Sequence, residues 1–435
     1  MQVQPASTSA APDPVRDALY KKIATRFLPL LCLCLVAAYL DRVNVGFAKL
    51  QMLDDLKFSN TIYGLGAGIF FVGYVLFEVP SNVLLHKVGA RIWIARIMIT
   101  WGIIGAGMAF VQTATQFYVL RFLLGVAEAG FIPGVLYFLS CWFPSARRGK
   151  MIALLLAAVP LSSVIGGPLS GWILSSFAGV GGLRAWQWLF LLETIPSVVL
   201  GYAVIRMLSD QPSRTPWLTA AEAAIVDQDI ASEAARNQSH SSFASAFKSG
   251  IVWQLTAAYF CIVSAVYVLI FWLPTLIKQN GVTDPVHIGL LTAIPYFAAI
   301  VASIYNNTMA DKHRERRWHT AIPCAITAVG LILAGMHFDS LVVTMLILTV
   351  SAAAASTTQA AFWSVPPTFL NGAAAAAGIA LINSLGNIGG MVSTSVVGWI
   401  TDLTGNAQNS LILFGGMLLV SVVLVLMLPS KLVNH

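Results

Sequence analysis

The segment Tyr39-Leu40-Asp41-Arg42-Val43-Asn44-Val45-Gly46-Phe47-Ala48 places two charged residues inside a mostly apolar run that begins at Phe27. If this run continues as a helix, Asp41 and Arg42 lie well inside a membrane span. A charged side chain at such a depth costs about 2.5 to 3.5 kcal/mol on insertion scales. Charges persist there when they pair with each other, face a water-filled cavity or carry out a function. The rest of the chain indicates which of these applies.

The composition indicates that most of the protein surface faces lipid rather than water. Only 10% of the 435 residues are charged and 57% are hydrophobic, whereas a soluble protein has about 25% charged residues. The sequence contains twelve apolar runs of roughly 20 residues, each long enough to cross a hydrocarbon core of about 30 Å. We predict an all-α membrane protein with twelve transmembrane helices. The spans are expected near residues 27–48, 62–85, 92–112, 116–140, 150–176, 186–208, 249–276, 288–309, 319–337, 340–362, 374–400 and 409–429.

The predicted spans fall into two six-helix halves, at residues 27–208 and 249–430. The links at 86–93 and 311–318 are both short and basic and both end in Trp, which indicates weak internal symmetry. Duplicated six-span halves are typical of transporters that bind their substrate between the halves, near the middle of the membrane.

The positive charge of the chain follows the predicted topology. A formal net charge of +7 is compatible with nucleic-acid binding, but Lys and Arg are concentrated in alternate links. By the positive-inside rule, the tail at residues 1–26, the central loop at 209–248 and both termini lie in the cytoplasm. Because the first 20 residues are polar, we expect no cleavable signal sequence. The five cysteines are interpreted as reduced, apolar side chains.

A capping box and rows of glycine mark particular helices. The run Thr219-Ala220-Ala221-Glu222 predicts a short helix within the central loop. Small residues at helix-packing spacing occur in the second, fifth and eleventh spans, where they let helices approach closely. They fit either packing alone or a seam along which the two halves move. These residues are Gly64, Gly66, Gly68 and Gly73, then Gly166, Gly167, Pro168 and Gly171, and finally Gly386, Gly389, Gly390 and Gly398.

The charged residues predicted at membrane depth all belong to the N-terminal half. Arg121 and Glu128 are two helical turns apart and therefore share one helix face. A carboxyl group buried without a cation holds its proton more tightly, and one beside an arginine releases it more readily. We therefore hypothesise that Asp41 and Glu128 couple protons to transport; the alternative is a static ion-pair network between the first and fourth spans. The complete set is Asp41, Arg42, Glu78, Arg121, Glu128 and Glu193.

Two arginines at depth, Arg42 and Arg121, favour an anionic substrate, because a guanidinium group binds a carboxylate through two parallel hydrogen bonds. Polar and aromatic side chains in other spans are candidates for contact with the remainder of a small polar molecule. The alternatives are simple packing for the aromatic residues and helix–helix hydrogen bonding for the asparagines. These candidates are Tyr39, Tyr74, Trp363, Asn383 and Asn387.

Charged residues near the predicted cytoplasmic ends of the spans are interpreted as gating residues. Glu78 lies toward that end of the second span, where we favour a gate or a helix-end contact over substrate binding. Arg91, Arg147 and Arg148 occupy basic links that set topology and can also pair with acidic residues to latch the inward side. Glu193 in the sixth span is interpreted as structural.

No pattern in the sequence indicates an enzyme, so no catalytic residue is predicted. The chain lacks the Gly-Lys-Ser/Thr loop that binds ATP. Its seven histidines lie in links, at span ends or at the terminus, without metal-ligand spacing. We expect no metal and no cofactor, with a proton gradient as the driving force.

Two segments are specific enough to indicate a family: LDRVNVGFA at 40–48 and RFLLGVAEAG at 121–130. With support from 77–82, 88–91 and 380–390, the chain from about residue 20 to 430 resembles the major facilitator superfamily and, within it, the anion:cation symporter family. The resemblance implies proton-driven uptake of organic carboxylates across a bacterial inner membrane. It also implies proton coupling by Asp41 and Glu128, charge handling by Arg42 and Arg121, and substrate contact by Tyr39, Tyr74, Trp363 and Asn383.

Within that family the chain is similar to members that carry tartrate- or phthalate-type acids, through the runs at 158–162 and 361–367. Sugar-acid carriers of the family have a glutamine in the fifth span, where this chain has Val159 or Pro160, so a polyol-rich substrate is less favoured. The run Gly166-Gly167-Pro168 resembles a motif of antiporters elsewhere in the superfamily, which keeps anion exchange open.

The leading hypothesis is a proton-coupled symporter that works by alternating access. The alternatives are an organic anion exchanger or exporter, a sugar-acid symporter, and a membrane sensor that binds its ligand without net transport. The expected partners are a small organic anion, protons and the lipid bilayer, without nucleic acid, and we expect the protein to be a monomer.

Overall fold

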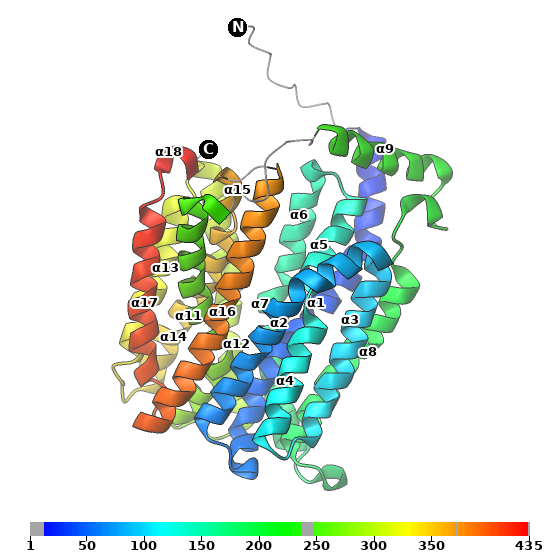
Figure 1. Ribbon diagram of the computed structural model, residues 1–435. Helices are drawn as coiled ribbons and strands as arrows, with labels where there is room; N and C mark the ends of the chain where they lie inside the picture. Colours follow the sequence, from blue (N-terminus) through cyan, green and yellow to red (C-terminus); the bar gives the residue numbers. More distant parts are fainter. Residues whose placement is uncertain (1–12, 237–246, 370–371, 434–435) are drawn as a thin grey trace.

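The computed structural model describes residues 13–236, 247–369 and 372–433, and the secondary structure of these residues is helical without strands (Figure 1). Twelve helices in the described chain are long and apolar enough to cross a membrane, which confirms the predicted all-α class. Residues 1–12 of the predicted tail and 237–246 of the predicted central loop lie outside the described residues.

The N-terminal half supplies six of the candidate spans, two of them built from two consecutive α-helices each. The 3-10 helix η1 (Met108–Phe110) extends α3, and η2 (Val180–Gly182) lies between α7 and α8. The helices are α1 (Pro14–Leu56), α2 (Asn60–Val88), α3 (Ala90–Gly107), α4 (Ala114–Glu128), α5 (Phe131–Trp142), α6 (Ser145–Leu156), α7 (Ala158–Ser176) and α8 (Ala185–Met207).

The C-terminal half supplies the other six candidate spans. Between the halves lie η3 (Pro212–Arg214) and α9 (Ala220–Arg236). The remaining helices are α11 (Gly250–Gln279), α12 (Pro285–His313), α13 (Arg317–Ala334), α14 (Leu341–Phe362), α15 (Pro366–Phe369), α16 (Gly372–Thr404), α17 (Asn409–Leu426) and α18 (Ser430–Val433).

Helix α1 begins well before the first predicted span. The Asp13 side chain accepts a hydrogen bond of 3.0 Å from the Val15 backbone N–H, and Pro14 occupies the first helical position. Both features favour a helix start. The second half of the segment predicted as a tail, 1–26, is therefore a helical extension beyond the bundle. We call the end of the bundle that carries this extension and α18 the terminal face, and the other end the opposite face.

Helix α9 lies across the terminal face of the N-terminal half (Figure 1). Its Asp229 accepts hydrogen bonds from Arg16 and from the Tyr20 hydroxyl of α1, the latter at 2.9 Å. Its Glu233 accepts one of 3.1 Å from Arg148 at the start of α6. These contacts fix α9 to the N-terminal half.

The predicted capping box of α9 is confirmed. The Glu222 backbone N–H donates to the Thr219 hydroxyl at 3.2 Å, and the Thr219 backbone N–H donates to the Glu222 carboxylate at 2.8 Å. Lys22 of α1 also donates to Glu222 at 2.8 Å, and this contact lowers the pKa of Glu222 from its ordinary value.

The seam between the halves is built from close backbone contacts at glycine. A Cβ atom added to Gly64 of α2 would lie 2.4 Å from the Thr394 carbonyl oxygen of α16. One added to Gly167 of α7 would lie 2.6 Å from the Gly289 carbonyl oxygen of α12. Only a residue without a side chain permits such approach. The second, fifth and eleventh spans therefore pack at the contact between the halves, and motion along this seam stays a prediction.

Hydrogen bonds tie the two halves together at the opposite face. The Asp402 carboxylate at the end of α16 accepts from the backbone N–H groups of Asn60 and Thr61 at the start of α2, at 2.9 and 2.7 Å. The Lys278 ammonium of α11 donates to the Leu50 carbonyl oxygen of α1 at 2.9 Å.

Candidate functional site

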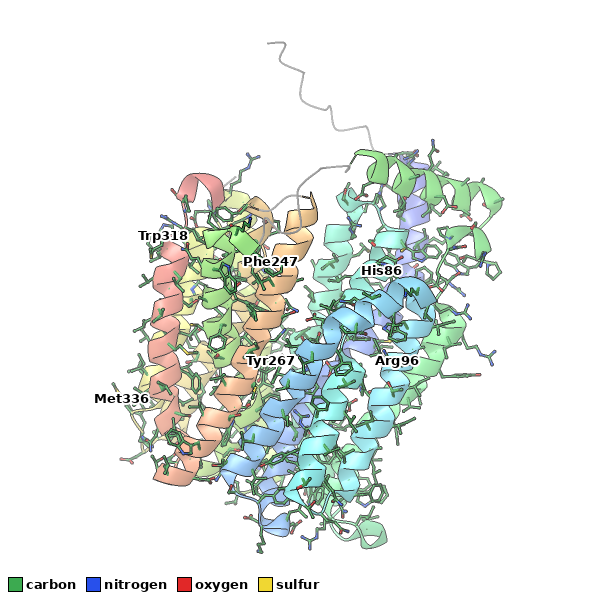
Figure 2. All side chains as sticks on the ribbon, viewed as in Figure 1. His86, Arg96, Phe247, Tyr267, Trp318 and Met336 are labelled. Carbon is green, nitrogen blue, oxygen red and sulfur yellow. The ribbon has the colours of Figure 1, made fainter. Side chains whose placement is uncertain are left out.

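The centre of the site is an ion pair between Arg42 of α1 and Glu128 of α4. Both side chains are buried. The other Nη atom of Arg42 donates a hydrogen bond of 3.0 Å to the Tyr267 hydroxyl of α11. Figure 2 places Tyr267 near mid-height of the bundle, where the two halves meet. One guanidinium group therefore links two helices of the N-terminal half with one of the C-terminal half.

A helix break positions Glu128. The fourth span was predicted as a continuous helix, but α4 ends at Glu128 and α5 begins at Phe131. Gly130 has φ of +87°, and a Cβ atom there would lie 2.3 Å from the Ser81 hydroxyl oxygen. That hydroxyl donates a hydrogen bond of 2.6 Å to the carbonyl oxygen of Ala129 within the break. A backbone break at membrane depth is tolerated where its polar groups are satisfied in this way, and such breaks are typical of transporter binding sites.

Aromatic rings surround the Arg42 guanidinium. Its central carbon lies 4.8 Å from the ring centroid of Tyr39, 5.4 Å from Phe70 and 5.9 Å from Tyr74. Ring faces attract a cation, most strongly where water is excluded. The predicted site residues Tyr39 and Tyr74 are thus brought to Arg42.

The side chain of Asp41 points in a different direction from that of its neighbour Arg42. Its Oδ2 accepts hydrogen bonds of 2.6 Å from the Trp101 indole of α3 and 2.7 Å from the Ser197 hydroxyl of α8. Its Oδ1 is buried without a hydrogen-bond partner. Asp41 therefore points into the N-terminal half and, among the described ion pairs, forms none with Arg42.

Arg121 is also buried and bonds to backbone. Its guanidinium donates to the carbonyl oxygens of Gly66 at 3.2 Å and Ala67 at 3.3 Å, and it lies 5.0 Å from the Phe70 ring centroid. No ion pair between Arg121 and a carboxylate occurs among the described residues. Of the charged residues predicted at depth, Arg42 and Glu128 thus form an ion pair, whereas Arg121 and Asp41 have neutral hydrogen-bond partners.

Glu78 connects the two halves on the terminal side of the ion pair. Its carboxylate accepts hydrogen bonds of 3.0 Å from Asn383 and 2.9 Å from Ser384, both in α16. Asn387 donates to Asn383 one turn away at 3.3 Å. The two asparagines predicted to contact substrate are therefore joined to the residue predicted to form a gate.

Trp363 follows the end of α14 and faces the same region. Its indole N–H donates a hydrogen bond of 3.1 Å to the Tyr259 hydroxyl of α11. The Tyr259 ring stacks on Phe362 with centroids 4.9 Å apart. The C-terminal half thus presents an aromatic wall.

The basic residues predicted to form an inward latch contact acidic partners within the N-terminal half and the loop that follows it. Arg147 pairs with Asp17, and Arg148 pairs with Glu233 of α9, as described above. The Arg91 backbone N–H donates to Asp210 at 2.8 Å. Gating by these residues stays a prediction.

Two features of the site were absent from the sequence-based set. Tyr259 and Tyr267 of α11 lie eight residues apart, so they share a helix face, and that spacing was the available signal. Lys49 of α1 is also buried, with its Nζ atom 3.2 Å from the Trp272 ring centroid and 4.8 Å from that of Tyr63. That Nζ atom has no hydrogen-bond partner.

No group of three or more potential metal ligands occurs within residues 13–236, 247–369 and 372–433. The chemistry that the site offers is ion pairing, hydrogen bonding and proton exchange at carboxyl groups.

Comparison with known proteins relates the chain to transporters. Residues 31–394 match the family described as Major Facilitator Superfamily. A Pseudomonas putida protein described as "Putative metabolite transport protein NicT" is 52% identical over 96% of this chain and 96% of its own length. An Agrobacterium vitis protein described as "Putative tartrate transporter" is 46% identical over 94% of this chain and 91% of its own length.

Solved structures share the fold at much lower identity. The crystal structure of a D-xylose-proton symporter has a TM-score of 0.72 at 15% identity, covering 93% of this chain and 98% of that one. A bacterial homolog of the human lysosomal transporter Spinster has a TM-score of 0.71 at 16% identity, covering 97% and 98%.

Proposed function

The chain belongs to the major facilitator superfamily and is a multi-pass membrane transporter rather than an enzyme, and from this we propose that it imports a small organic carboxylate together with protons. The observation that carries the proposal is the buried Arg42–Glu128 ion pair, which is shared with Tyr267 of the other half. The driving force is a proton gradient, without a cofactor.

The ion pair offers a direct way to couple proton and anion. A guanidinium group binds a substrate carboxylate through the same donors that hold Glu128. While Glu128 is ionised it competes with the substrate for Arg42, and once protonated it no longer does. Glu128 is the last residue of α4, and a helix C-terminus disfavours negative charge, so this position favours the protonated form of Glu128. Proton uptake by Glu128 therefore makes Arg42 available to the anion.

Arg121 supports a preference for anions over neutral molecules. It is buried, and its partners are neutral carbonyl oxygens. With Arg42 balanced by Glu128, the positive charge of Arg121 is in excess. A buried charge without a counter-charge is costly, so an arriving carboxylate lowers the electrostatic energy of the site.

The proposed substrate is a tartrate- or phthalate-like acid. Tyr39 and Tyr74 surround Arg42, and Trp363, Asn383 and Asn387 supply aromatic and amide groups from the C-terminal half. The name of the Agrobacterium vitis relative supports a small hydroxylated diacid. A thermal-shift screen of dicarboxylates, aromatic acids and sugar acids on the purified protein is expected to show stabilisation by the first two classes and to overturn this assignment if only sugar acids stabilise.

The proposed orientation places the terminal face in the cytoplasm of a bacterial cell, with the protein in the inner membrane. Arg16, Arg147 and Arg148 lie on that face, and basic residues favour the cytoplasmic side. Glu78 then lies between the ion pair and the cytoplasm, where its bonds to Asn383 form an inner gate.

The decisive variant is Glu128→Gln, assayed in proteoliposomes. Its neutral amide leaves Arg42 free at every pH, so substrate counterflow is expected to persist while proton-driven accumulation is lost. The matched control is Asp339→Asn, which also replaces a carboxylate with an amide, but at an exposed link residue. This variant is expected to accumulate substrate as the wild type does. Unchanged proton-driven accumulation in Glu128→Gln would refute the coupling role.

A further inference from the structure

A second pair of carboxyl groups, Asp41 and Glu193, lies inside the N-terminal half. Glu193 of α8 is only 1% exposed. Its Oε1 accepts a hydrogen bond of 2.7 Å from the Ser170 hydroxyl of α7, and its Oε2 is buried without a partner. Asp41 has the same arrangement: one oxygen accepts from neutral donors and the other has no partner. Glu193 lies one helical turn before Ser197, the residue of α8 that donates to Asp41, and Asn44 of α1 lies beside it.

No cation on the helices that pack against α8 serves this pair. The arginines of α3, Arg91 and Arg96, lie in the part of that helix nearest the terminal face. Helix α7 and η1 carry no charged residue. On α1, Arg42 is paired with Glu128 and Lys49 lies against Trp272. Asp41 is therefore the charged group that faces Glu193.

Two ionised carboxylates cannot share such a place without a large cost. The electrostatic cost of a charge at membrane depth applies to each of them, and repulsion between like charges adds to it. The hydroxyl and indole groups that donate to the two carboxyl groups are neutral, so they do not balance a negative charge. They bind only one oxygen of each carboxyl group. The unpartnered oxygen of each group is the atom free to carry a proton.

We propose that Asp41 and Glu193 act as one proton-holding pair that carries two protons in one state of the transport cycle and one in the other. The proton leaves from Asp41, and the remaining proton is shared: the O–H bond of Glu193 breaks as an O–H bond forms on Asp41, and the negative charge moves the opposite way. This inference rests on the proposed proton coupling and adds Glu193 to it. Asp41 connects the pair to the anion site, because it adjoins Arg42, which forms the ion pair with Glu128.

Infrared spectroscopy of the full-length protein in nanodiscs tests the pair without a substrate. The carboxylic-acid C=O absorption is followed as a function of pH. Because the two groups interact, they should contribute two steps separated by about one pH unit or more, beside the step of Glu128, which Glu128→Gln removes. Glu193→Gln is expected to abolish the higher-pH step of the pair and leave the other. Ser170→Ala, which removes a donor and keeps both carboxyls, is expected to retain two steps.

Asp41→Asn removes the other carboxyl group of the pair and is likewise expected to leave one titration step. This variant replaces Glu193→Gln in the experiment if Glu193→Gln fails to fold. Glu128→Gln should leave the higher-pH step in place. Two unchanged steps of the pair in both Glu193→Gln and Asp41→Asn would overturn the proposal, as would a single step of the pair when the titration is carried out in Glu128→Gln. If transport proves independent of protons, the two-step titration is still expected, so failure of the proposed function and failure of this pair are distinguishable.

In proteoliposomes Glu193→Gln is expected to shift the pH profile of proton-driven uptake while substrate counterflow remains. A purely structural role for Glu193 would lower both activities together and leave the pH profile unchanged, which would also count against the pair.

Discussion

Arg42 makes two contacts that a lysine cannot make in the same geometry. Its planar guanidinium directs one nitrogen to Glu128 and the other to the Tyr267 hydroxyl, while its flat face lies against Tyr39. A lysine ammonium is a point charge that does not reproduce this fork. The identity of the residue therefore matters beyond its charge.

Arg42→Lys is expected to raise the KM for substrate by about tenfold to a hundredfold, since a hydrogen bond to a charged group contributes about 1.5 to 3 kcal/mol. Tyr267→Phe removes only the bond of 3.0 Å and should have a smaller effect, about threefold to tenfold. Initial uptake rates measure both. Arg214→Lys at an exposed position is the matched control, and a wild-type KM in Arg42→Lys would contradict the role.

The sequence named Arg42 and Glu128 as candidate functional residues, and it offered an ion-pair network between the first and fourth spans as an alternative without specifying which residues pair. Their contact joins α1 to α4, and nothing in the spacing within one helix specifies a contact between two. Asp41 and Arg42 are adjacent in sequence, but they do not pair with each other. Consecutive residues on a helix point about 100° apart, so adjacency separates their side chains.

At the scale of helices, the seam depends on residues that lack a side chain. Gly64 approaches the backbone of Thr394, so any Cβ atom there requires α2 and α16 to move apart. Gly416 of α17 is a helical glycine with nothing within 4 Å of an added Cβ. The same glycine-to-alanine substitution at these two positions therefore compares a close helix contact with an open helix surface.

Gly64→Ala is expected to lower the midpoint of thermal unfolding and to reduce transport, because overpacking a close contact costs about 1 to 3 kcal/mol. Gly416→Ala should be neutral or slightly stabilising, since alanine favours a helix over glycine by about 1 kcal/mol. Thermal unfolding in detergent with parallel uptake assays compares them. If the two variants had the same unfolding midpoint and the same uptake, the close contact between α2 and α16 would not be required for stability or transport.

Helix existence was predictable and helix interruption was not. The apolar runs indicated the spans because apolar length is what a membrane requires. The break after Glu128 depends on Ser81, which lies in another helix and satisfies the freed carbonyl oxygen. Gly130 alone was an insufficient signal, because glycines also occur within the continuous helices of the seam.

At the scale of the molecule, the opposite face closes over a buried cation. Lys49 of α1 is enclosed by Tyr63 of α2 and Trp272 of α11. The attraction between a cation and an aromatic ring face contributes about 0.5 to 2 kcal/mol. Removing an ion from water costs several kcal/mol. The closed opposite face therefore carries a cost, which hydration of Lys49 would relieve on separation of the halves in the proposed alternating-access cycle.

Lys49→Met is expected to stabilise the closed opposite face and so to slow transport, with the KM measured from the terminal side little changed. Spin labels at Asp54, in the last turn of α1, and at Asp339, in the link between α13 and α14, would show a narrower distance distribution than in the wild type. Lys150→Met, an exposed residue of α6, is the control. A broader distribution or wider separation in Lys49→Met would contradict this account.

The charges of the described C-terminal half lie at its helix ends, whereas Arg121 sits at depth in the N-terminal half without a carboxylate partner. In the proposed cycle, Arg121 serves as a fixed counter-charge for two groups in turn: the substrate while the carrier is loaded, and the ionised Asp41–Glu193 pair while it returns empty. With Glu128 and the pair each gaining one proton on loading, a dianion leaves both forms of the carrier without net charge, and uptake follows the pH difference alone. A monoanion leaves one positive charge uncompensated, and the membrane potential acts on it with about 2.3 kcal/mol per 100 mV.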